Sequence, residues 1–305
     1  MSNYFSKLVM ALKMANYHRL RKRREPQRVA YRQWVLEHDT IGEAQRRLLE
    51  QTHLSLPRHP LLSVIMPVYN PPLPWLEEAI ESVRAQVYQA WELCIAEDCS
   101  TDPEVRPYLK SKAAQDPRIK LDFRARNGHI SAASNSAIAM AQGEFLVLMD
   151  QDDLIPMNAL LTVAEAINQH PEAGLIYTDE DKVDEQGLRE SPTKKGGWDP
   201  KSLQTSNRIS HLGVYRTSLA RQVGGFRVGF EGAQDHDLVL RCVELLRDDQ
   251  IIYIPKILYH WRIHANSTAH MRSSKPYAAK ARSKALQDHV SRMAERKHQA
   301  NTPIK

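Results

Sequence analysis

The sequence predicts an α/β fold in which a Rossmann-like, mostly parallel sheet is flanked by helices, with helical extensions at both ends. Three observations lead to this prediction. Short apolar runs alternate with amphipathic helical patterns between residues 60 and 183. Acidic and amide residues directly follow several of these runs, and ligands of parallel sheets bind beyond the carboxyl ends of the strands. No apolar run approaches the roughly 20 residues that are needed to span a bilayer.

Five strands and four helices are expected in the central part of the chain. The helix after the first strand has Pro74 near its start, where a missing N–H costs nothing. The small-residue helix ISAASNSAIAMAQ is expected to stop at Gly143, which would act as its C-terminal cap. The strands are expected at 62–70, 91–98, 119–125, 145–149 and 173–181, and the helices at 74–86, 102–115, 130–142 and 158–170.

Less regular sequence follows the fifth strand. A loop-rich stretch at 184–215 leads to GAQDHDLVLRCVEL, which predicts a loop that enters a helix, and residues 251–268 predict a late pair of strands. The run LPRHP at 56–60 is typical of a linker. We therefore expect three parts: a basic helical N-terminal extension at 1–59, the α/β domain at 60–270 and a basic helical tail at 271–305.

Charge is distributed unevenly along the chain. Residues 1–32 carry a net charge of +8 and residues 271–305 carry +7, which leaves −9 on the body between them. Apolar residues from Phe5 to Ala15 recur at helical spacing before the basic run HRLRKRR, so this arm is expected to lie on an anionic membrane surface, at about 1 kcal/mol per basic residue. A solvated basic helix without a ligand is an equal alternative. The acidic body and the lack of a recognisable module argue against nucleic acid as a partner.

The cysteines and the N-terminus indicate the compartment. Cys94, Cys99 and Cys242 form neither an even framework nor a CxxC pair, which is typical of reduced thiols. The N-terminal segment is interrupted by lysines and lacks a small-residue cleavage site, so a secretory signal is not expected. We expect a cytoplasmic protein, peripheral at the inner face of the membrane if the basic arm binds lipid.

The stretch FLVLMDQDD places three carboxylates within four positions, at Asp150, Asp152 and Asp153, directly after a buried strand. Such carboxylates repel one another unless water or a cation compensates them. Hard carboxylate oxygens suit Mg²⁺ or Mn²⁺, which can neutralise a diphosphate. The chain contains neither GxGxxG after the first strand nor GxxxxGK[ST], so ordinary dinucleotide and Walker-type phosphate binding are disfavoured.

Several motifs occur in a characteristic order: VIMPVYN, AEDCSTD, RNGHISAASN, MDQDD, GGFRVGFEGAQDHDLVLR and YHWRIHANST. Together they resemble the family 2 glycosyltransferases, over roughly residues 60–270. The resemblance is strongest to bacterial enzymes of O-antigen and related surface polysaccharide synthesis, including rhamnosyltransferases. It implies the GT-A fold and the transfer, with inversion, of a hexosyl or deoxyhexosyl group from a nucleotide-diphosphate sugar to a hydroxyl of a glycan or lipid-linked acceptor.

The resemblance also assigns residues to the donor. Asp98 matches the acid that accepts a hydrogen bond from the nucleotide base, although this chain has Cys99 where relatives often have glycine. Loop packing is an alternative role for Pro67 and Tyr69, and a polar helix position is an alternative for Asn135. The residues that match the donor pocket are Pro67, Tyr69, Asn70, Asp98, Asn127, Gly128, Ser131 and Asn135.

The metal ligands and the diphosphate contacts are implied in the same way. Asp152 matches the metal-binding acid, and Asp150 matches a position that contacts ribose or the metal. His260 and His264 lie in a segment that can supply a further metal ligand, while Arg262 could pair with diphosphate oxygens. Structural roles remain open for these three residues. The implied cofactor is a divalent cation, Mn²⁺ or Mg²⁺.

The resemblance implies that Asp235 is the general base, which would take the proton from the acceptor hydroxyl. Relatives often have Glu-Asp here, whereas this chain has Gln234 before the acid. Asp237 is the rival candidate, although its sequence context is typical of a packed helix. Trp198 and His211 are expected on the acceptor side, with core packing as the alternative for Trp198.

Two other functions fit parts of the sequence. One is a non-catalytic relative that binds a nucleotide sugar or a glycan, which the joint presence of Asp98, Asp150, Asp152 and Asp235 argues against. The other is a metal-dependent phosphotransferase of the haloacid-dehalogenase type. That reading needs a distant Lys and Asp pair and leaves the GAQDHDL segment without a role.

Overall fold

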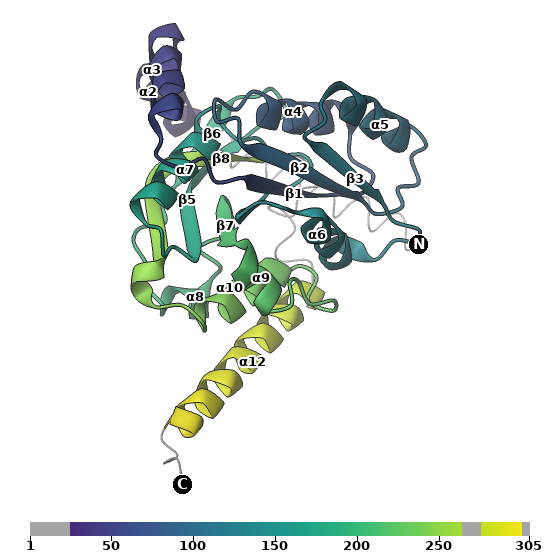
Figure 1. Ribbon diagram of the computed structural model, residues 1–305, viewed down its shortest axis with the longest axis vertical. Coiled ribbons are helices and arrows are strands. Elements are labelled where there is room, and N and C mark those ends of the chain that lie inside the picture. Colours follow the sequence, from purple (N-terminus) through teal and green to yellow (C-terminus); the bar gives the residue numbers. More distant parts are fainter. Residues whose placement is uncertain (1–24, 264–275, 301–305) are drawn as a thin grey trace.

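The computed structural model describes residues 25–263 and 276–300, and in this part of the chain an eight-stranded mixed sheet lies between layers of helices (Figure 1). The strand order is β3-β2-β1-β4-β7-β5-β6, with β8 paired to β5. The strands are β1 (Leu62–Val68), β2 (Trp91–Glu97), β3 (Ile119–Phe123), β4 (Phe145–Leu148), β5 (Leu175–Val183), β6 (Arg189–Thr193), β7 (Gly213–Arg216) and β8 (Ile251–Arg262).

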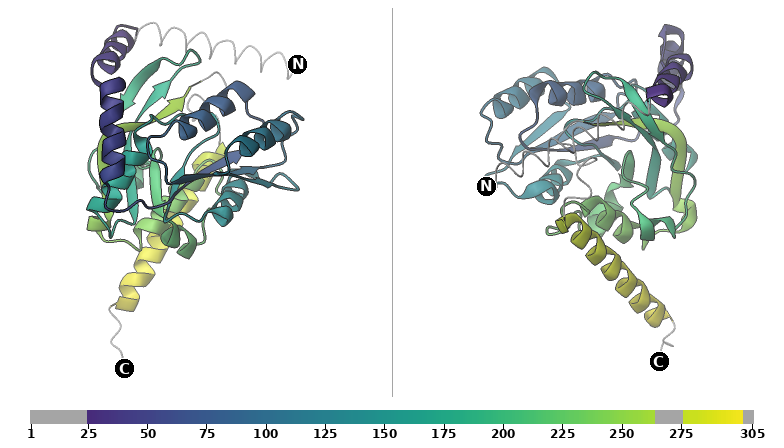
Figure 2. Two further views of the ribbon diagram at one scale, coloured as in Figure 1. Left: turned by 45° about the horizontal axis from the view of Figure 1, so that its top comes forward. Right: turned by 180° about the vertical axis from the view of Figure 1, so that it is seen from behind.

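The described α-helices are α2 (Glu25–His38), α3 (Glu43–Ser55), α4 (Leu73–Arg84), α5 (Val105–Gln115), α6 (His129–Met140), α7 (Ala159–Gln169), α8 (Ser202–Thr205), α9 (Thr217–Gln222), α10 (Gln234–Val243) and α12 (Pro276–Ala300). Helices α4 and α7 cover one face of the sheet and α6, α9 and α10 the other, and the described helices also include elements that extend from the body (Figures 1 and 2). The alternation of predicted strands and helices from residue 62 to residue 183 is thus confirmed.

The strand directions place the ends of the predicted strands on one edge. β1 pairs in parallel with β2 and β4, β2 with β3, and β5 with β8. The short strand β7 runs antiparallel to both β4 and β5, so these two strands run in the same direction. The carboxyl ends of β1, β2, β4, β5 and β8 therefore lie along one edge of the sheet, and the amino end of β7 lies at that same edge.

The core consists of two apolar clusters, one on each face of the sheet. Side chains alternate between the faces along β1, where Val64 and Met66 belong to one cluster and Ile65 to the other. The first cluster packs under α4 and α7, and the second under α6, α9 and α10. Because both faces are covered, the strands read as nearly continuous apolar runs.

Three details differ from the expectations. α6 ends at Met140, and Gly143 is not its cap; a Cβ at Gly143 would lie 2.6 Å from the Leu61 carbonyl oxygen, so this glycine permits a close approach to β1. The expected late pair of strands is a single strand, β8, with register shifts in its pairing with β5. The fifth strand, expected to end at Asp181, extends to Val183, so the acids from Asp179 to Asp181 lie within β5.

Both extensions pack against the α/β domain where they are described. Arg28 of α2 is buried and forms ion pairs with Asp184 and Glu190 beside β6. Ala281 and Ala285 of α12 are buried, Arg292 pairs with Glu244 at the end of α10, and the C-terminal end of α12 points away from the sheet (Figures 1 and 2). The expected amphipathic segment at 5–15 lies outside the described residues, and the domain boundaries stay predictions. Within the described ranges, no helix is both long and apolar enough to cross a membrane.

Candidate active site

Two carboxylates and an imidazole meet at the carboxyl edge of the sheet. Asp150 and Asp153 lie in the loop after β4, and His211 lies just before β7. One potential ligand atom from each of the three residues lies within 4.8 Å of the others. The antiparallel strand β7 brings His211 here, because it starts at the edge where β4 ends.

The electrostatic environment of Asp150 suits a cation. Burial raises the pKa of its carboxyl group; His211 opposes this effect, and Asp152 and Asp235 add to it. Within the described residues the Asp150 carboxylate accepts no hydrogen bond, and the buried Nδ1 of His211 has no hydrogen-bond partner. Asp150 and His211 are both half-buried, so a ligand can reach them from solvent, and a carboxylate and an imidazole both suit Mn²⁺.

Strand β8 clamps the loop that carries these acids. The Tyr259 hydroxyl donates to Asp153 Oδ2 at 2.6 Å and accepts from the Asp150 N–H at 3.1 Å. The Arg262 N–H donates to Asp153 Oδ1 at 2.7 Å, and Arg262 Nε donates to the Asp152 carbonyl at 2.7 Å. Asp153 is therefore fully buried and satisfied, although burial raises its pKa. The Arg262 guanidinium, expected on the diphosphate, holds this loop and pairs with Glu78.

Two other expected metal ligands, Asp152 and His260, do not belong to the group of Asp150, Asp153 and His211. Asp152 is half-buried and close enough to raise the pKa of Asp150. His260 Nδ1 lies 2.6 Å from Asp181 Oδ1, so that nitrogen is engaged with a carboxylate. His264 lies outside the described residues. His211, expected on the acceptor side, is the histidine that the described structure groups with the carboxylates, and its ring stacks on Tyr259 with centroids 4.6 Å apart.

Asp98 sits at the end of β2 with one edge of its carboxylate already in use. Arg124 Nε donates to Oδ1 at 2.7 Å, and the Gly128 N–H donates to the same oxygen at 2.9 Å. Asn127 Nδ2 donates to the Asp98 carbonyl at 3.2 Å. Cys99 has a φ of +59°, so the cysteine adopts the left-handed conformation that glycine favours. The loop conformation therefore survives the loss of the glycine.

Asn70 and Tyr69 connect the loop after β1 to its neighbours. Asn70 Oδ1 accepts from the Thr101 N–H at 2.8 Å, which ties this loop to the one after β2. The Gln151 side chain accepts from the Tyr69 N–H at 2.8 Å and donates to the Tyr69 carbonyl at 3.1 Å. The Tyr69 side chain is exposed beside the acidic loop, whereas Pro67 is partly buried inside β1.

Two expected donor-pocket residues lie on α6. Ser131 is fully buried in its first turn. Asn135 uses both ends of its amide on the backbone of Phe226: Nδ2 donates to the carbonyl and Oδ1 accepts from the N–H, each at 2.8 Å. Asn135 therefore fixes the loop that precedes α10.

The two acids at the start of α10 lie in opposite environments. Asp235 is partly exposed, accepts a hydrogen bond from Asn207 Nδ2 at 2.9 Å and contributes to the raised pKa of Asp150. Asp237 is fully buried and is paired with both Arg227 and Arg241. Asp235 thus has a carboxylate oxygen to spare at the acidic edge, whereas Asp237 is committed to ion pairs.

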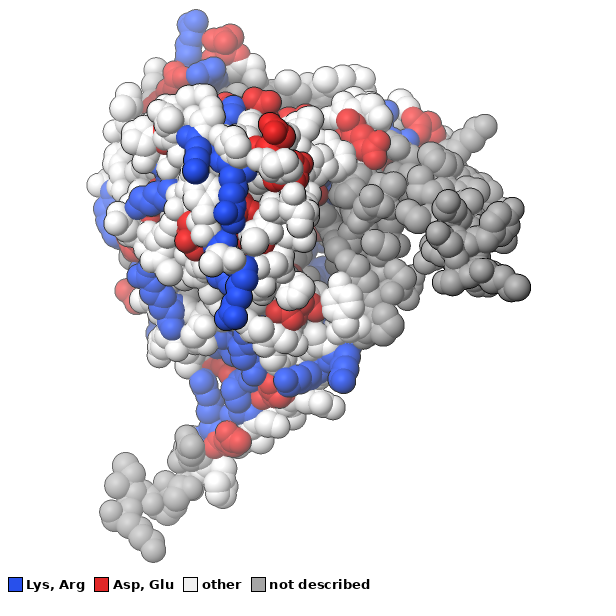
Figure 3. Space-filling view, turned by 90° about the vertical axis from the view of Figure 1, so that its right-hand side faces the viewer, with Lys and Arg blue, Asp and Glu red and all other residues white. Residues whose placement is uncertain are grey.

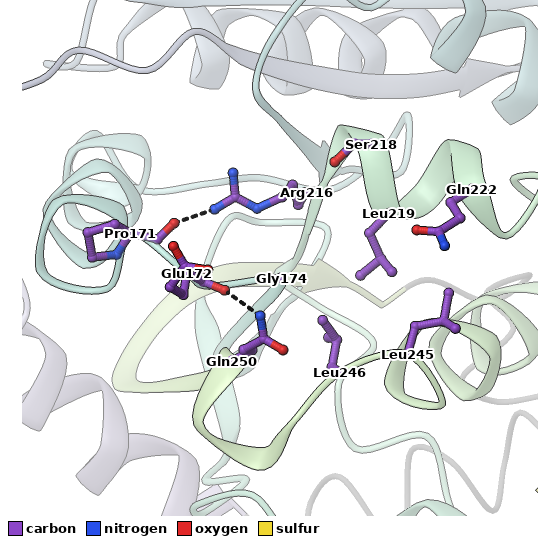
Figure 4. A pocket seen from close by; sticks show the side chains of 10 residues that line it. All are labelled: Pro171, Glu172, Gly174, Arg216, Ser218, Leu219, Gln222, Leu245, Leu246 and Gln250. Atoms are coloured by element: carbon purple, nitrogen blue, oxygen red, sulfur yellow. Dashed lines mark hydrogen bonds between the residues drawn. The ribbon is translucent and has the colours of Figure 1, made fainter. Parts of the chain in front are cut away.

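Trp198 and a cavity of the structure lie away from the carboxyl edge of the sheet. Trp198 packs on the second apolar cluster, and its Nε1 donates to Asp248 at 2.8 Å. A cavity of about 420 Å³ lies by the amino end of β5 and the end of β7, the edge opposite the acids (Figure 4). Arg216 in its wall already donates to Glu144 and to the Pro171 and Ala173 carbonyls. The Arg216 guanidinium in this cavity is therefore already engaged by protein groups.

Sequence reasoning missed several residues that shape the site, among them Arg124, Gln151, Asn207 and Tyr259. Each acts through a partner distant in sequence, which no local spacing reveals. Tyr259 had the best available signal, since it adjoins the expected His260.

Comparisons with known proteins agree with this architecture. A model of the family described as glycosyl transferase family 2 matches residues 63–224. The protein y4gI of Sinorhizobium fredii is 53% identical over 233 residues, which cover 76% of this chain and 26% of that protein. The O-antigen biosynthesis protein RfbC of Myxococcus xanthus is 36% identical over 240 residues, which cover 79% of this chain and 19% of that protein. The chain thus spans about a quarter of the length of the first relative and about a fifth of the second.

Solved structures share the fold. TarS 1–349 of S. aureus in complex with UDP-GlcNAc superposes with a TM-score of 0.58 at 22% identity, covering 70% of this chain and 61% of that one. The mannosyltransferase PcManGT of Pyrobaculum calidifontis, in complex with GDP-Man and Mn²⁺, gives 0.53 at 17% identity and covers 84% and 82%. The GT-A fold expected from the sequence is confirmed. Because the family model matches more than half of its residues, this chain belongs to glycosyl transferase family 2.

Proposed function

We propose that this chain is an inverting, metal-dependent glycosyltransferase that uses a nucleotide-diphosphate sugar. One observation carries the proposal: the Asp150 carboxylate, which accepts no hydrogen bond from the described residues, and the His211 imidazole lie together at the carboxyl edge, with the acid Asp235 nearby. Acids with perturbed pKa values at the ligand-binding edge of such a sheet are the expected signature of a functional site.

The donor would lie across the loops that end β1, β2 and β4. Asp98 is held in a fixed orientation by Arg124 and Gly128, which leaves Oδ2 with room to accept a hydrogen bond from a nucleotide base. Asn70 joins two of these loops, and the exposed Tyr69 ring offers a face to the base or ribose. Both the UDP-GlcNAc complex of TarS and the GDP-Man complex of PcManGT involve nucleotide-diphosphate sugars, which supports this donor class.

The residues present fit a divalent cation. Asp150 and His211 would hold it, with the half-buried Asp152 as the further ligand predicted from the sequence. Such a cation, when bound, neutralises charge on the diphosphate. Asp153 orients the loop, because Tyr259 and Arg262 occupy its two oxygens. The Mn²⁺ in the PcManGT complex supports manganese as the first cation to test.

Asp235 would act as the general base. The acceptor hydroxyl oxygen attacks the anomeric carbon and loses its proton to the Asp235 carboxylate, while the bond from that carbon to the nucleoside diphosphate breaks on the opposite face. This in-line displacement inverts the configuration. Asn207 Nδ2 donates to Asp235 Oδ2 and orients the carboxylate, and no described residue donates to Oδ1. A positioned base of this kind contributes about 10²–10⁴-fold to the rate.

The acceptor is a glycan or a lipid-linked saccharide of a bacterial surface polysaccharide, as the name of the relative RfbC suggests. Peripheral attachment to an anionic membrane through residues 1–32 would bring a lipid-linked acceptor within reach. Figure 3 supports an anionic surface as a partner, since Lys and Arg side chains gather in a band along one face of the molecule.

A screen of nucleotide sugars by thermal shift, with and without Mn²⁺, tests the proposal. A donor that binds the folded state raises the melting temperature in proportion to its occupancy. We expect one nucleotide-diphosphate sugar to stabilise the protein in the presence of Mn²⁺ and much less after chelation, with Asp98→Asn as the variant that loses the shift. If no nucleotide sugar stabilises the chain with either Mn²⁺ or Mg²⁺, the donor assignment is wrong.

A further inference from the structure

Helix α2 lies outside the segment that the family model matches, yet it contacts a buried acid of the sheet. The Tyr31 hydroxyl donates a hydrogen bond of 2.7 Å to Asp181 Oδ2, and Arg189 Nε donates to the same oxygen at 2.6 Å. Asp181 is fully buried within β5. A buried carboxylate needs donors on its oxygens, so α2 supplies part of what holds Asp181 in place.

The other oxygen of Asp181 points to β8. Oδ1 lies 2.6 Å from His260 Nδ1, and this contact fixes the ring of a residue in the strand that clamps the acidic loop. The backbone of His260 pairs with Leu154 in both directions: the His260 N–H donates to the Leu154 carbonyl at 2.8 Å, and the Leu154 N–H donates back at 3.1 Å. Leu154 directly follows Asp153. A continuous set of contacts thus joins Tyr31 to the loop at 150–154.

The buried ion pairs of Arg28 hold α2 against the sheet and thereby hold Tyr31 in contact with Asp181. The Arg28 side chain is only 9% exposed and pairs with Asp184 and Glu190. A guanidinium buried to this extent stays there only if its partners stay with it. Tyr31 lies one turn further along the same helix and is therefore held at a constant distance from Asp181.

We propose that Asp181 is a positioning residue, and that α2 holds the acidic loop at 150–154 in its cation-binding geometry through Asp181 and His260. The role assigned to the loop rests on the proposed function. The mechanical connection does not, because it depends only on contacts within the folded chain.

Amide hydrogen exchange of the peptide that contains residues 150–154 tests the connection without metal or donor. Tyr31→Phe removes one hydrogen bond to Asp181 and leaves the rest of α2 intact. Arg32→Ala is the matched control, since Arg32 contacts Asp184 in the same helix–hairpin contact but does not touch Asp181. We expect roughly three- to tenfold faster exchange of the loop in Tyr31→Phe and an unchanged rate in Arg32→Ala.

A titration of the metal-free protein with Mn²⁺ gives the second readout. Partners that orient metal ligands are typically worth about 10–100-fold in affinity, and Asp181 acts one contact further away, so we expect Mn²⁺ to bind roughly three- to tenfold more weakly in Tyr31→Phe. Asp181→Asn should show a larger loss, and if that variant fails to fold, Tyr31→Phe still decides the question.

The outcomes separate the two proposals. Loop exchange within twofold of wild type in Tyr31→Phe, or equal acceleration in Arg32→Ala, would overturn the positioning role. A wild-type protein that binds no Mn²⁺ contradicts the proposed metal site, while the exchange comparison between the two variants still tests the connection from α2.

Discussion

Asp235 and Asp237 lie two positions apart in the first turn of α10, and we expect the same substitution to affect them in opposite ways. Asp237→Asn removes the charge that neutralises Arg227 and Arg241, and the Arg241 side chain is only 8% exposed. The loss of one partner from a buried ion pair costs about 3–5 kcal/mol, because the remaining charge is left unpaired. In a domain of this size each kcal/mol lowers the melting temperature by roughly 2–4 °C, so the expected decrease is about 6–20 °C.

Asp235→Asn should leave the melting temperature almost unchanged. Its carboxylate is partly exposed and accepts one hydrogen bond from the described part of the chain, from Asn207, which the asparagine oxygen can still accept. The variant should keep donor binding and lose transfer by about 10²–10⁴-fold. Thermal melts, donor titrations and release of the nucleoside diphosphate measure the three quantities separately.

Two outcomes would contradict the assignment of Asp235 as the base. Retained transfer in Asp235→Asn, or lost transfer in an Asp237→Asn protein that melts like wild type, would assign the base to Asp237 and refute the burial argument. If Asp237→Asn unfolds at the assay temperature, Arg227→Gln is a milder test of the same ion pairs, because the Arg227 side chain is 32% exposed.

Three further predictions concern the acidic loop and the N-terminal arm. Asp152→Asn should abolish the stimulation of turnover by Mn²⁺ without a change in the melting temperature, and full metal-stimulated activity would contradict the ligand assignment. Burial holds the pKa of Asp150 above the ordinary value of 3.8, so the folded metal-free protein binds a proton that the unfolded chain does not. Acidification through that raised pKa should therefore increase stability more in wild type than in Asp150→Asn, where the raised pKa of Asp153 still contributes, and equal pH profiles in chelator-treated melts would argue against it. Deletion of residues 1–24 should release the protein from anionic vesicles in a sedimentation assay, whereas deletion through residue 32 would also remove the buried Arg28; unchanged vesicle binding would show that the arm is not the anchor.

The fold could be predicted from the sequence because its buried strands and amphipathic helices are locally distinct. The runs of β1, β2 and β4 are covered on both faces, so they lack the alternation of a surface strand and stand out against the neighbouring helices, whereas the edge strand β3 alternates apolar and polar residues. Gly143 shows the limit of this reasoning. Its position after a helix is typical of a cap, but the actual reason for the glycine is the close approach to Leu61, which only the packed sheet creates.

The acids of the candidate site could be predicted, but their partners could not. A carboxylate at the end of a parallel strand lies at the ligand edge whatever its neighbours are, so the placement of Asp98 and Asp150 follows from topology alone. His211 precedes a strand of only four residues in a loop-rich stretch, and its position depends on the antiparallel insertion of β7. His260 was expected at the metal, yet the register between β5 and β8 pairs it with Asp181.

The hydrogen bonds of the buried acids distinguish structural from functional carboxylates. Asp153, Asp181 and Asp237 are all nearly inaccessible, and each has donors from at least two residues. Asp150 lies in the same region with its pKa raised by burial, and no hydrogen bond from the described residues reaches its carboxylate. Described residues donate hydrogen bonds to Asp153, Asp181 and Asp237 but none to the Asp150 carboxylate. This difference is explained if a cation binds Asp150. Within this loop, the environment of Asp150 therefore favours a role in binding a ligand, and the hydrogen bonds of Asp153 indicate a role in holding the loop in place.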